Sequence, residues 1–251
     1  MINLKDSVAI VTGGSSGIGF GIAQGLLECG ADLSLWSRCP EKLNNAKEQL
    51  STQFDAQILT VPCDVSIERQ VIDAMQQTLE YFGKIDILVA NAGIAKAKPL
   101  IDSSLEDIRK VNKVNFEGTF LCFREAARQF ITQGNGGKLI AVTSTAAING
   151  YANLSSYSAS KGAVASMTRA LAVELGPYNI QVNSILPGVF HTPMTGELEN
   201  LELNYLPKMP ANIIGLSQHI KSAAAFLAAR ESNYVTGITL PVDGGISIAA
   251  Y

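Results

Sequence analysis

Short apolar runs rich in β-branched residues alternate with helical patterns along the whole chain, and this alternation limits the fold more than any other feature. The first run, residues 8–12, is apolar up to Thr12 and ends in two glycines, which is typical of a strand buried on both faces. Further strands are predicted at residues 32–36, 57–61, 86–90, 138–143, 180–185 and 237–242. Helical spacing predicts helices at residues 17–29, 41–50, 67–82, 107–133, 155–175 and 218–229.

Six strand-then-helix steps predict a parallel sheet, because each right-handed crossover places a helix on one of its two faces. With the seventh strand, the fold class is α/β: a single doubly wound domain, residues 1–251, with a seven-stranded parallel sheet and helices on both faces. One long irregular stretch, residues 187–215, contains four prolines and three glutamates. Loops of this length in compact domains are usually functional, so residues 188–215 are predicted to form a lid over a substrate.

The composition excludes several classes of protein. With 47% hydrophobic and 16% charged residues, the chain can bury a core and has too few charges for disorder. A net charge of -3 with no long run of like charges argues against partners such as nucleic acid or a membrane surface. No apolar stretch is long enough to span a membrane, and the N-terminus makes a poor signal peptide. Four cysteines without a Cys-x-x-Cys pair indicate reduced thiols and a cytoplasmic protein, and the two distant histidines predict no metal site.

A glycine-rich turn follows the first strand directly. Its sequence is Thr-Gly-Gly-Ser-Ser-Gly-Ile-Gly, residues 12–19, and a predicted helix begins within it. Glycines let the backbone turn tightly and approach a pyrophosphate, whose charge the N–H groups at the helix start would hold. The turn therefore predicts a dinucleotide site; the alternative is an ordinary glycine-serine turn.

The end of the second predicted strand bears on which nucleotide is used. An NAD site usually offers a carboxylate here, and an NADP site offers a cation for the 2′-phosphate. This chain has Ser37 at the acid's position and Arg38 beside it. A guanidinium can donate two parallel hydrogen bonds to a phosphate, so NADP is favoured over NAD. The alternative is that Arg38 is a solvated loop residue.

Tyr157 and Lys161 lie four residues apart in a predicted helix, so both side chains leave the same face. A carbonyl that accepts hydride must also take a proton, and an ammonium about 4 Å from a phenolate would lower the phenol pKa by roughly three units. This spacing predicts an acid/base tyrosine. Ser144, at the end of the fifth strand, lies on the same rim of the sheet and could orient the substrate oxygen. Taken singly, each of these residues also occurs by chance.

Together, the Gly-x-x-x-Gly-x-Gly spacing and Tyr157-Ser-Ala-Ser-Lys161 resemble the short-chain dehydrogenase/reductases, a family with a Rossmann fold. The resemblance covers essentially the whole chain. It also rests on the following residues: Asp64, Ala90-Asn91-Ala92-Gly93, Asn115, Ser144, Pro187-Gly188 with Thr192, and Val242-Asp243-Gly244-Gly245.

The resemblance implies roles for individual residues. The cofactor would contact Asp64 and Val65 along the adenine, Asn91 and Gly93 behind the ribose, and Lys161 at the nicotinamide ribose. For Asp64, a turn residue before the following helix is the alternative. Asn115 would hold a proton-relay water, although Asn112 competes on spacing. The remaining expected cofactor contacts are Gly13, Ser15, Ser16, Gly17, Ile18 and Gly19 in the turn, Ser37 and Arg38, Tyr157, and Pro187, Gly188, Val189 and Thr192 at the carboxamide.

The predicted function is an NADP-dependent oxidoreductase that moves hydride between nicotinamide and a small-molecule carbonyl or secondary alcohol. A 3-oxoacyl-carrier-protein reductase is a narrower alternative. Asn135 and Tyr178 stand where such reductases tend to carry arginines, and the lid adds Glu197, Glu199 and Glu202, which would repel an acidic carrier. Residues 209–217 also depart from the family's Gly-Arg-x-Gly-x-Pro-Glu pattern.

Two further expectations concern an alternative function without catalysis and the oligomeric state. A nucleotide sensor without catalysis is an alternative function, against which the presence of both Tyr157 and Lys161 argues. The resemblance also implies a homotetramer, with the apolar C-terminal residues 246–251 at a subunit contact.

Overall fold

The computed structural model describes residues 2–249 and forms one seven-stranded parallel sheet, in the order β3-β2-β1-β4-β5-β6-β7. This confirms the predicted fold class. The predicted strands agree with the observed ones to within about two residues at each end. The observed strands are β1 (Val8–Thr12), β2 (Asp32–Ser37), β3 (Ile58–Pro62), β4 (Ile87–Ala90), β5 (Gly137–Val142), β6 (Ile180–Pro187) and β7 (Thr239–Val242).

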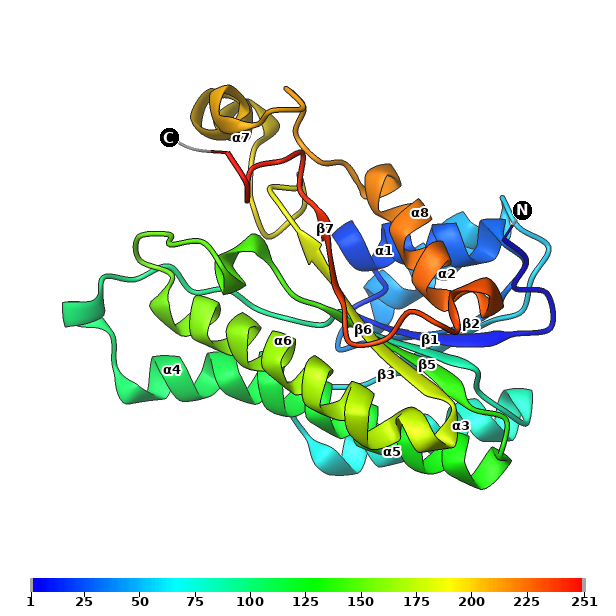
Figure 1. The fold of residues 1–251 in the computed structure, drawn as a ribbon. Helices are drawn as coiled ribbons and strands as arrows, with labels where there is room; N and C mark the ends of the chain where they lie inside the picture. Colours follow the sequence, from blue (N-terminus) through cyan, green and yellow to red (C-terminus); the bar gives the residue numbers. More distant parts are fainter. Residues whose placement is uncertain (1, 250–251) are drawn as a thin grey trace.

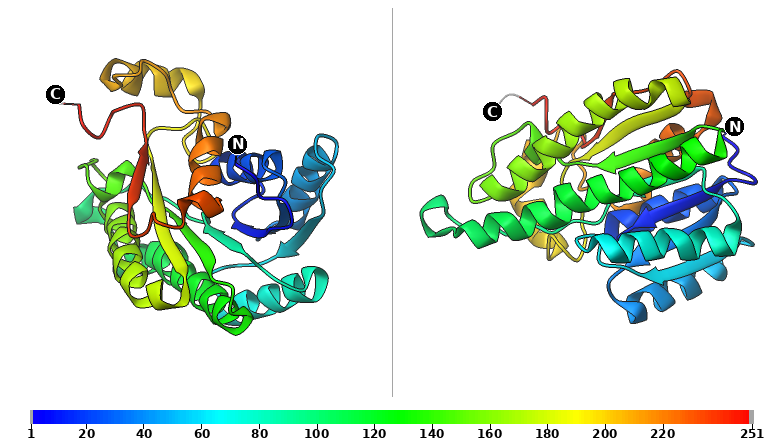
Figure 2. Two further views of the ribbon diagram at one scale, coloured as in Figure 1. Left: turned by 45° about the vertical axis from the view of Figure 1, so that its right-hand side comes forward. Right: turned by 90° about the horizontal axis from the view of Figure 1, so that it is seen from below.

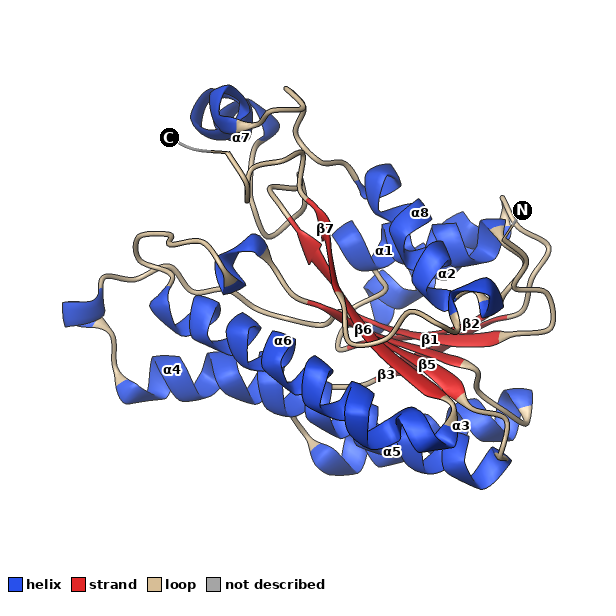
Figure 3. Ribbon diagram, viewed as in Figure 1, coloured by secondary structure: helices blue, strands red, loops and turns tan. Residues whose placement is uncertain are grey.

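Helices cover both faces of the sheet (Figure 1). One face carries α1 (Gly17–Glu28), α2 (Pro40–Ser51) and α8 (Lys221–Ala228), and the other carries α3 (Glu68–Phe82), α5 (Gly118–Gln133) and α6 (Ser155–Leu175). Figure 2 shows the second layer from below. Two helices lie beyond these layers: α4 (Leu105–Asn112), which leads into α5, and α7 (Leu198–Tyr205), which stands above the carboxyl end of the sheet (Figure 3).

The strand order reverses between β1 and β4. Strand β1 pairs with β2 on one side and with β4 on the other, and all five of its residues are buried. In an open parallel sheet, the crevice beyond the carboxyl ends of two such strands is where a ligand binds. The fold therefore places its candidate site at the ends of β1 and β4.

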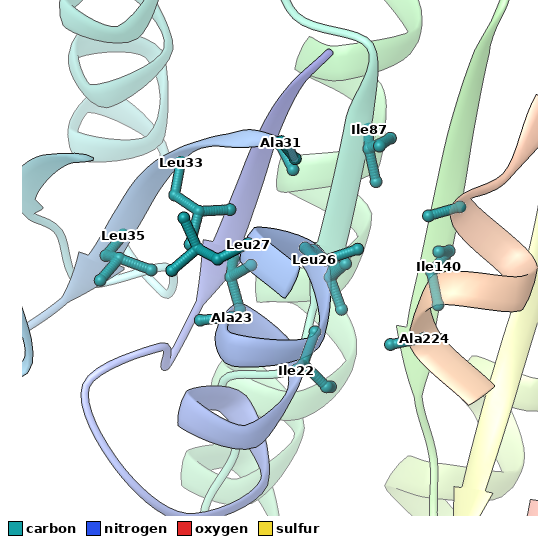
Figure 4. Close-up of a cluster of buried hydrophobic side chains, with 14 of the residues drawn as sticks. Ile22, Ala23, Leu26, Leu27, Ala31, Leu33, Leu35, Ile87, Ile140 and Ala224 are labelled. Carbon is teal, nitrogen blue, oxygen red and sulfur yellow. The ribbon is translucent and has the colours of Figure 1, made fainter. Parts of the chain in front are cut away.

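Two apolar clusters hold the helices to the sheet. On the α1 face, Ile22 and Leu26 are fully buried and belong to the same cluster as Leu33 and Leu35 of β2 (Figure 4). On the opposite face, the largest buried side chains are Trp36, Phe123 and Phe130. Burying each such side chain stabilises the fold by about 1.5–3 kcal/mol, so the two layers fix the strand ends that carry the site.

The predicted continuous helix at residues 107–133 is wrong in one respect, because a π-helical turn, Lys113–Glu117, separates α4 from α5. Ser104 is the N-cap residue of α4, and its side chain accepts a hydrogen bond from the N–H of Asp107 in a capping box. The π turn contains Asn115, which is fully buried. Single π turns inside helices often occur at functional sites.

The stretch predicted as irregular, residues 187–215, contains the helix α7. Its apolar side faces a small cluster in which Leu201, Met209 and Ile214 pack with Ile246 near the C-terminus. Residues 187–215 therefore pack on the C-terminal segment, and their role as a lid stays a prediction. Of the predicted C-terminal contact, residues 246–249 are described, and Ala250 and Tyr251 lie outside the described residues.

None of the helices within residues 2–249 combines the length and the apolar character needed to cross a membrane. That part of the chain also contains no group of three or more His, Cys, Asp or Glu side chains that could hold a metal ion.

Candidate active site

The glycine turn after β1 has no room for larger residues. Gly13 and Gly17 adopt left-handed backbone conformations, with φ of 64° and 56°. A Cβ on Gly13 would lie 2.8 Å from Nδ2 of Asn91, and a Cβ on Gly19 would overlap both that atom and the Gly13 carbonyl oxygen. The turn therefore packs so closely on itself and on Asn91 that these two positions accept only glycine.

Helix α1 begins directly behind this turn. Its N-cap residue is Ser16, whose side chain makes no capping hydrogen bond. The first N–H groups of a helix lack partners within the helix and favour a negative charge. Ser15, Ser16 and Ile18 thus lie at a helix N-terminus that suits an anion, and their contact with a nucleotide stays a prediction.

Thr12 and Asn91 fasten the turn to the end of β4. The Thr12 hydroxyl accepts hydrogen bonds from the N–H groups of Asn91 and Ala92, both at 3.0 Å. The Asn91 amide donates in return to the carbonyl oxygens of Thr12, at 3.0 Å, and Gly13, at 3.3 Å. Asn91 was predicted to lie behind the ribose, and its side chain here holds the glycine turn. Thr12 carries no sequence signal for this role beyond its place as the last residue of the strand.

The end of β2 lies beside the same turn. The Ser15 hydroxyl donates a hydrogen bond to Ser37 Oγ at 3.1 Å. This bond joins the glycine turn to the end of β2, the two regions predicted to contact the nucleotide. Arg38 is exposed, and it makes no ion pair with any residue in the range 2–249. Its guanidinium could therefore hold the 2′-phosphate of a nucleotide at the end of β2.

Asp64 forms a local turn at the end of β3. Its carboxylate accepts hydrogen bonds from the N–H of Ser66 at 3.0 Å and from its hydroxyl at 2.7 Å. The Asp64 N–H donates to the side chain of Gln70. Asp64 thus has the alternative role, that of a turn residue before the following helix. Val65 is buried, and a Cβ on Gly118 of α5 would lie 2.7 Å from its side chain.

Asn115 links three elements from within the π turn. Its side chain accepts a hydrogen bond from the N–H of Ile94 at 2.8 Å and donates to the carbonyl of Ile94 at 3.0 Å. Nδ2 also donates to the hydroxyl of Ser160 at 3.0 Å, and that hydroxyl donates to the carbonyl of Tyr157 at 2.7 Å. Asn115 therefore braces the segment after β4 against α6, whereas its rival Asn112 bonds only within its own helix. Gly93 lies in the same region, because a Cβ there would be 3.2 Å from Asn115 Oδ1 and 3.4 Å from Lys161 Nζ.

Ser144, Tyr157 and Lys161 meet at this rim of the sheet. The Nζ of Lys161 lies 5.8 Å from the centre of the Tyr157 ring and donates a hydrogen bond to the carbonyl of Val142 at 2.7 Å. Burial lowers the pKa of Lys161 to about 8. Burial also raises the pKa of Tyr157 above its usual value, and a hydrogen bond from the Ser144 hydroxyl lowers it by less.

The expected depression of the Tyr157 pKa by Lys161 is therefore wrong for the chain alone. The Lys161 ammonium donates its hydrogen bond to the Val142 carbonyl. The Tyr157 phenolate would lose its hydration on burial, and this raises the pKa by more than the Ser144 hydrogen bond lowers it. At neutral pH the phenol keeps its proton and can donate it.

The segment after β6 reaches the glycine turn from the opposite side. A Cβ on Gly17 would lie 3.2 Å from the Thr192 side chain and 3.7 Å from Pro193. Gly188 packs closely on Asp243, and the N–H of Gly215 donates to the carbonyl of Val189 at 2.9 Å. Pro187, the last residue of β6, leads into this segment. Both ends of residues 188–215 thus lie near the predicted cofactor contacts.

Comparison with known proteins identifies the family. The model of the Enoyl-(Acyl carrier protein) reductase family matches residues 13–247. The chain is 37% identical over 248 residues to 2-dehydro-3-deoxy-D-gluconate 5-dehydrogenase of Dickeya dadantii, covering 97% of this chain and 96% of that one. A crystal structure of a short-chain type dehydrogenase/reductase from Mycobacterium marinum has a TM-score of 0.94 and 33% identity, covering 98% of this chain and 97% of that one.

The chain belongs to the short-chain dehydrogenase/reductase family. It is an oxidoreductase of alcohol and carbonyl groups that depends on a nicotinamide cofactor. Solved relatives hold either nucleotide. The structure of 3-ketoacyl-(acyl-carrier-protein) reductase from Brucella melitensis is complexed with NADH; it has 33% sequence identity and a TM-score of 0.91, covering 98% of this chain and 100% of that one. The structure described as an NAD(P) dependent gluconate 5-dehydrogenase from Beutenbergia cavernae has bound NADP; it has 29% sequence identity and a TM-score of 0.91, covering 97% of this chain and 98% of that one.

Proposed function

We propose that this protein is an NADP-preferring carbonyl reductase in which Tyr157 donates the proton. The observation that carries the proposal is the meeting of Ser144, Tyr157 and Lys161 at the rim beyond β5, at the same edge of the sheet as the glycine turn and the N-terminus of α1. Bound nicotinamide supplies the hydride, and every other task falls to side chains of this chain.

Each catalytic side chain has one task in this scheme. The Ser144 hydroxyl orients the substrate oxygen and contacts the Tyr157 phenol, which gives its proton to that oxygen as the carbonyl is reduced. Lys161 holds the nicotinamide ribose and returns a proton to Tyr157. Asn115 positions the relay through its bonds to Ile94 and Ser160. A phenol with a raised pKa is protonated at neutral pH, which is the state in which it can donate a proton to the substrate oxygen.

The preference for NADP rests on Ser37 and Arg38. No carboxylate stands at the end of β2 to repel a 2′-phosphate, and the exposed Arg38 has no ion-pair partner among residues 2–249. The test is the affinity for NADPH and NADH, followed by fluorescence titration. We expect Arg38→Ala to weaken NADPH binding about tenfold or more and to leave NADH unchanged, since hydrogen bonds to charged groups contribute about 1.5–3 kcal/mol. Equal effects on both nucleotides would remove the proposed preference.

The substrate is proposed as a small carbonyl compound free of an acidic carrier. Exposed Glu197, Glu199 and Glu202 on and beside α7 favour this over the acyl-carrier substrate of a relative such as the 3-oxoacyl-[acyl-carrier-protein] reductase of Chlamydia muridarum. A panel of 2,3-butanedione, 5-keto-D-gluconate and acetoacetyl-coenzyme A tests this with the preferred nucleotide. A clear preference for the coenzyme A thioester would favour the acyl-carrier alternative.

Replacement of the phenol tests whether the protein is a catalyst or a nucleotide sensor. Tyr157→Phe keeps the ring and removes the proton donor, so we expect unchanged NADPH affinity and loss of nearly all turnover. Turnover at the wild-type rate in this variant would reject the acid/base role. Binding without turnover in the wild type, across the whole panel, would favour the sensor.

We further propose a homotetramer in the cytoplasm. Exposed apolar side chains gather near the C-terminal elements: Phe226, Tyr234, Ile238 and Ile248. All four cysteines are free, which suits a reducing compartment. Light scattering at micromolar concentration tests the assembly, and a monomer would contradict it.

A further inference from the structure

A hydrogen bond between Thr145 and Tyr151 lies next to the catalytic serine and has no part in the scheme above. Thr145 Oγ1 and the Tyr151 hydroxyl are 3.0 Å apart. Thr145 is 2% exposed, and Tyr151 is half-buried. Two side chains six residues apart are thereby joined across a loop.

The Thr145 end of this bond belongs to the same rigid turn as Ser144. The N–H of Ala146 donates to Ser144 Oγ at 3.2 Å, and a 3-10 turn, Thr145–Ala147, follows at once. The carbonyl of Thr145 accepts from the N–H of Asn149 at 2.8 Å. Since Ser144 Oγ already accepts one hydrogen bond, its own hydrogen is free to be donated, and the turn decides where it points.

The Tyr151 end belongs to the loop that leads into α6. The carbonyl of Tyr151 accepts from the N–H of Leu154 at 3.3 Å, directly before the helix that carries Tyr157. The carbonyl of Asn153 accepts from the N–H of Lys98 at 2.8 Å, which ties the same loop to the segment after β4. The Thr145–Tyr151 bond therefore connects the serine's turn to an anchored loop.

We infer that Tyr151 is a positioning residue, whose hydroxyl holds Thr145 and thereby keeps the Ser144 hydroxyl aimed at the Tyr157 phenol and the substrate oxygen. The inference rests on the proposed role of Ser144. Without the bond, the turn loses its only side-chain tie to the loop among the hydrogen bonds of residues 2–249. Ser144 then samples directions in which it no longer donates to the phenol.

The test compares variants that remove the bond from either end. Tyr151→Phe and Thr145→Val each keep the shape and lose one hydroxyl, and Thr145→Ser restores the hydroxyl. Reduction of the fastest carbonyl in the panel with NADPH should show kcat lower by about five- to tenfold in both, an unchanged NADPH affinity, and no further loss in the double variant. Thr145→Ser should recover most of the rate. Tyr178→Phe, remote from the site, is the matched control and should match the wild type.

A second readout needs no substrate. Because the Ser144 hydrogen bond lowers the pKa of Tyr157, its loss should move the phenol's titration to higher pH. With tyrosine labelled with carbon-13 at Cζ, NMR follows each phenol, and Tyr157→Phe assigns the signal. We expect the Tyr157 phenol to titrate at higher pH in both Tyr151→Phe and Ser144→Ala than in the wild type. A structural role of Tyr151 alone would lower the melting temperature without this shift.

The outcomes separate this inference from the proposed function. If Ser144→Ala turns over normally, the proposed role of Ser144 fails. If Ser144→Ala is impaired while Tyr151→Phe keeps both the wild-type rate and the wild-type titration, the positioning role is overturned. If the wild type reduces no carbonyl, the titration of Tyr157 alone decides.

Discussion

Lys138 is a buried lysine remote from the active site. Its replacement by methionine tests how much the buried charge lowers the free energy of unfolding. It lies in β5, is 6% exposed, and reaches the exposed Asn233 side chain with Nζ to Oδ1 at 2.6 Å. Burial lowers its pKa from 10.5 to about 8, and the nearby Glu231 offsets this only in part. The charged form is therefore less stable in the folded chain than in the unfolded one.

The sign and size of the effect follow from proton linkage. Between pH 8 and 10.5 the unfolded chain holds a proton on Lys138 that the folded chain has released, so stability rises with pH. The rise from pH 7 to pH 9 is about 1.3 kcal/mol for one such lysine. Lys161, with its pKa also lowered to about 8, adds a similar amount. The thiols of Cys63 and Cys122, whose pKa values burial raises, oppose the rise increasingly as the pH approaches and passes 9, so pH 7–9 is the useful window.

Lys138→Met keeps the aliphatic stem and removes the charge. The full shift corresponds to about 3 kcal/mol at neutral pH, and solvation through the exposed Asn233 reduces it, so we expect a gain of about 1–3 kcal/mol. Water can replace the lost partner of Asn233. Between pH 7 and pH 9 the stability of the variant should rise by about 1.3 kcal/mol less than that of the wild type.

Urea unfolding followed by circular dichroism at pH 7, 8 and 9 measures both effects. Lys47→Met in α2, at an exposed position, is the matched control and should leave stability nearly unchanged. The reasoning is refuted if the wild type shows no rise between pH 7 and pH 9, or if Lys138→Met is destabilised with its pH dependence intact.

Two other substitutions test the turn and the strand that frame the nucleotide. Gly19→Ala places a methyl group onto the Gly13 carbonyl, so NADPH affinity should fall at least about tenfold by fluorescence titration, whereas Gly176→Ala, with open space around it, should bind normally. Trp36→Phe removes the indole N–H that donates to Ser34 at 3.0 Å and leaves the bond between Ser34 and Thr78 intact. We expect it to lower the free energy of unfolding by about 1–3 kcal/mol, measured by circular dichroism in urea, and wild-type stability would contradict that packing argument.

The sequence is most informative where local pattern and burial agree. Residues 8–12 form β1 with the predicted bounds, because a parallel strand buried on both faces is apolar throughout. The glycine turn was predictable for a similar reason, since its positive φ angles and close contacts exclude side chains. The positions of Ser144, Tyr157 and Lys161 on one rim follow from the strand-then-helix order alone.

Features that depend on distant partners were not predictable in this way. The π turn at Asn115 interrupts a pattern that is helical by periodicity, and the buried Asn115 there bonds to Ile94 and Ser160, which are far away in sequence. The pKa of Tyr157 was expected to fall because spacing shows a nearby lysine and does not show that its Nζ is bonded to Val142. Tyr151 carried no signal at all, since a single loop tyrosine gives no hint of its partner.

The π turn also makes the length of the chain between α4 and α5 part of the site. A π turn holds one residue more than an α-helical turn, so deleting one residue within Lys113–Glu117 would leave an unbroken α-helix. Since each residue of an α-helix turns the chain by about 100°, α4 would rotate by that angle relative to α5. Asp107, which bridges Lys96 at 2.5 Å and Lys98 at 3.0 Å, would swing away from both lysines. A homologue that conserves every catalytic residue but lacks this one extra position would therefore be expected to hold α4 rotated about its axis, without the ion pairs of Asp107.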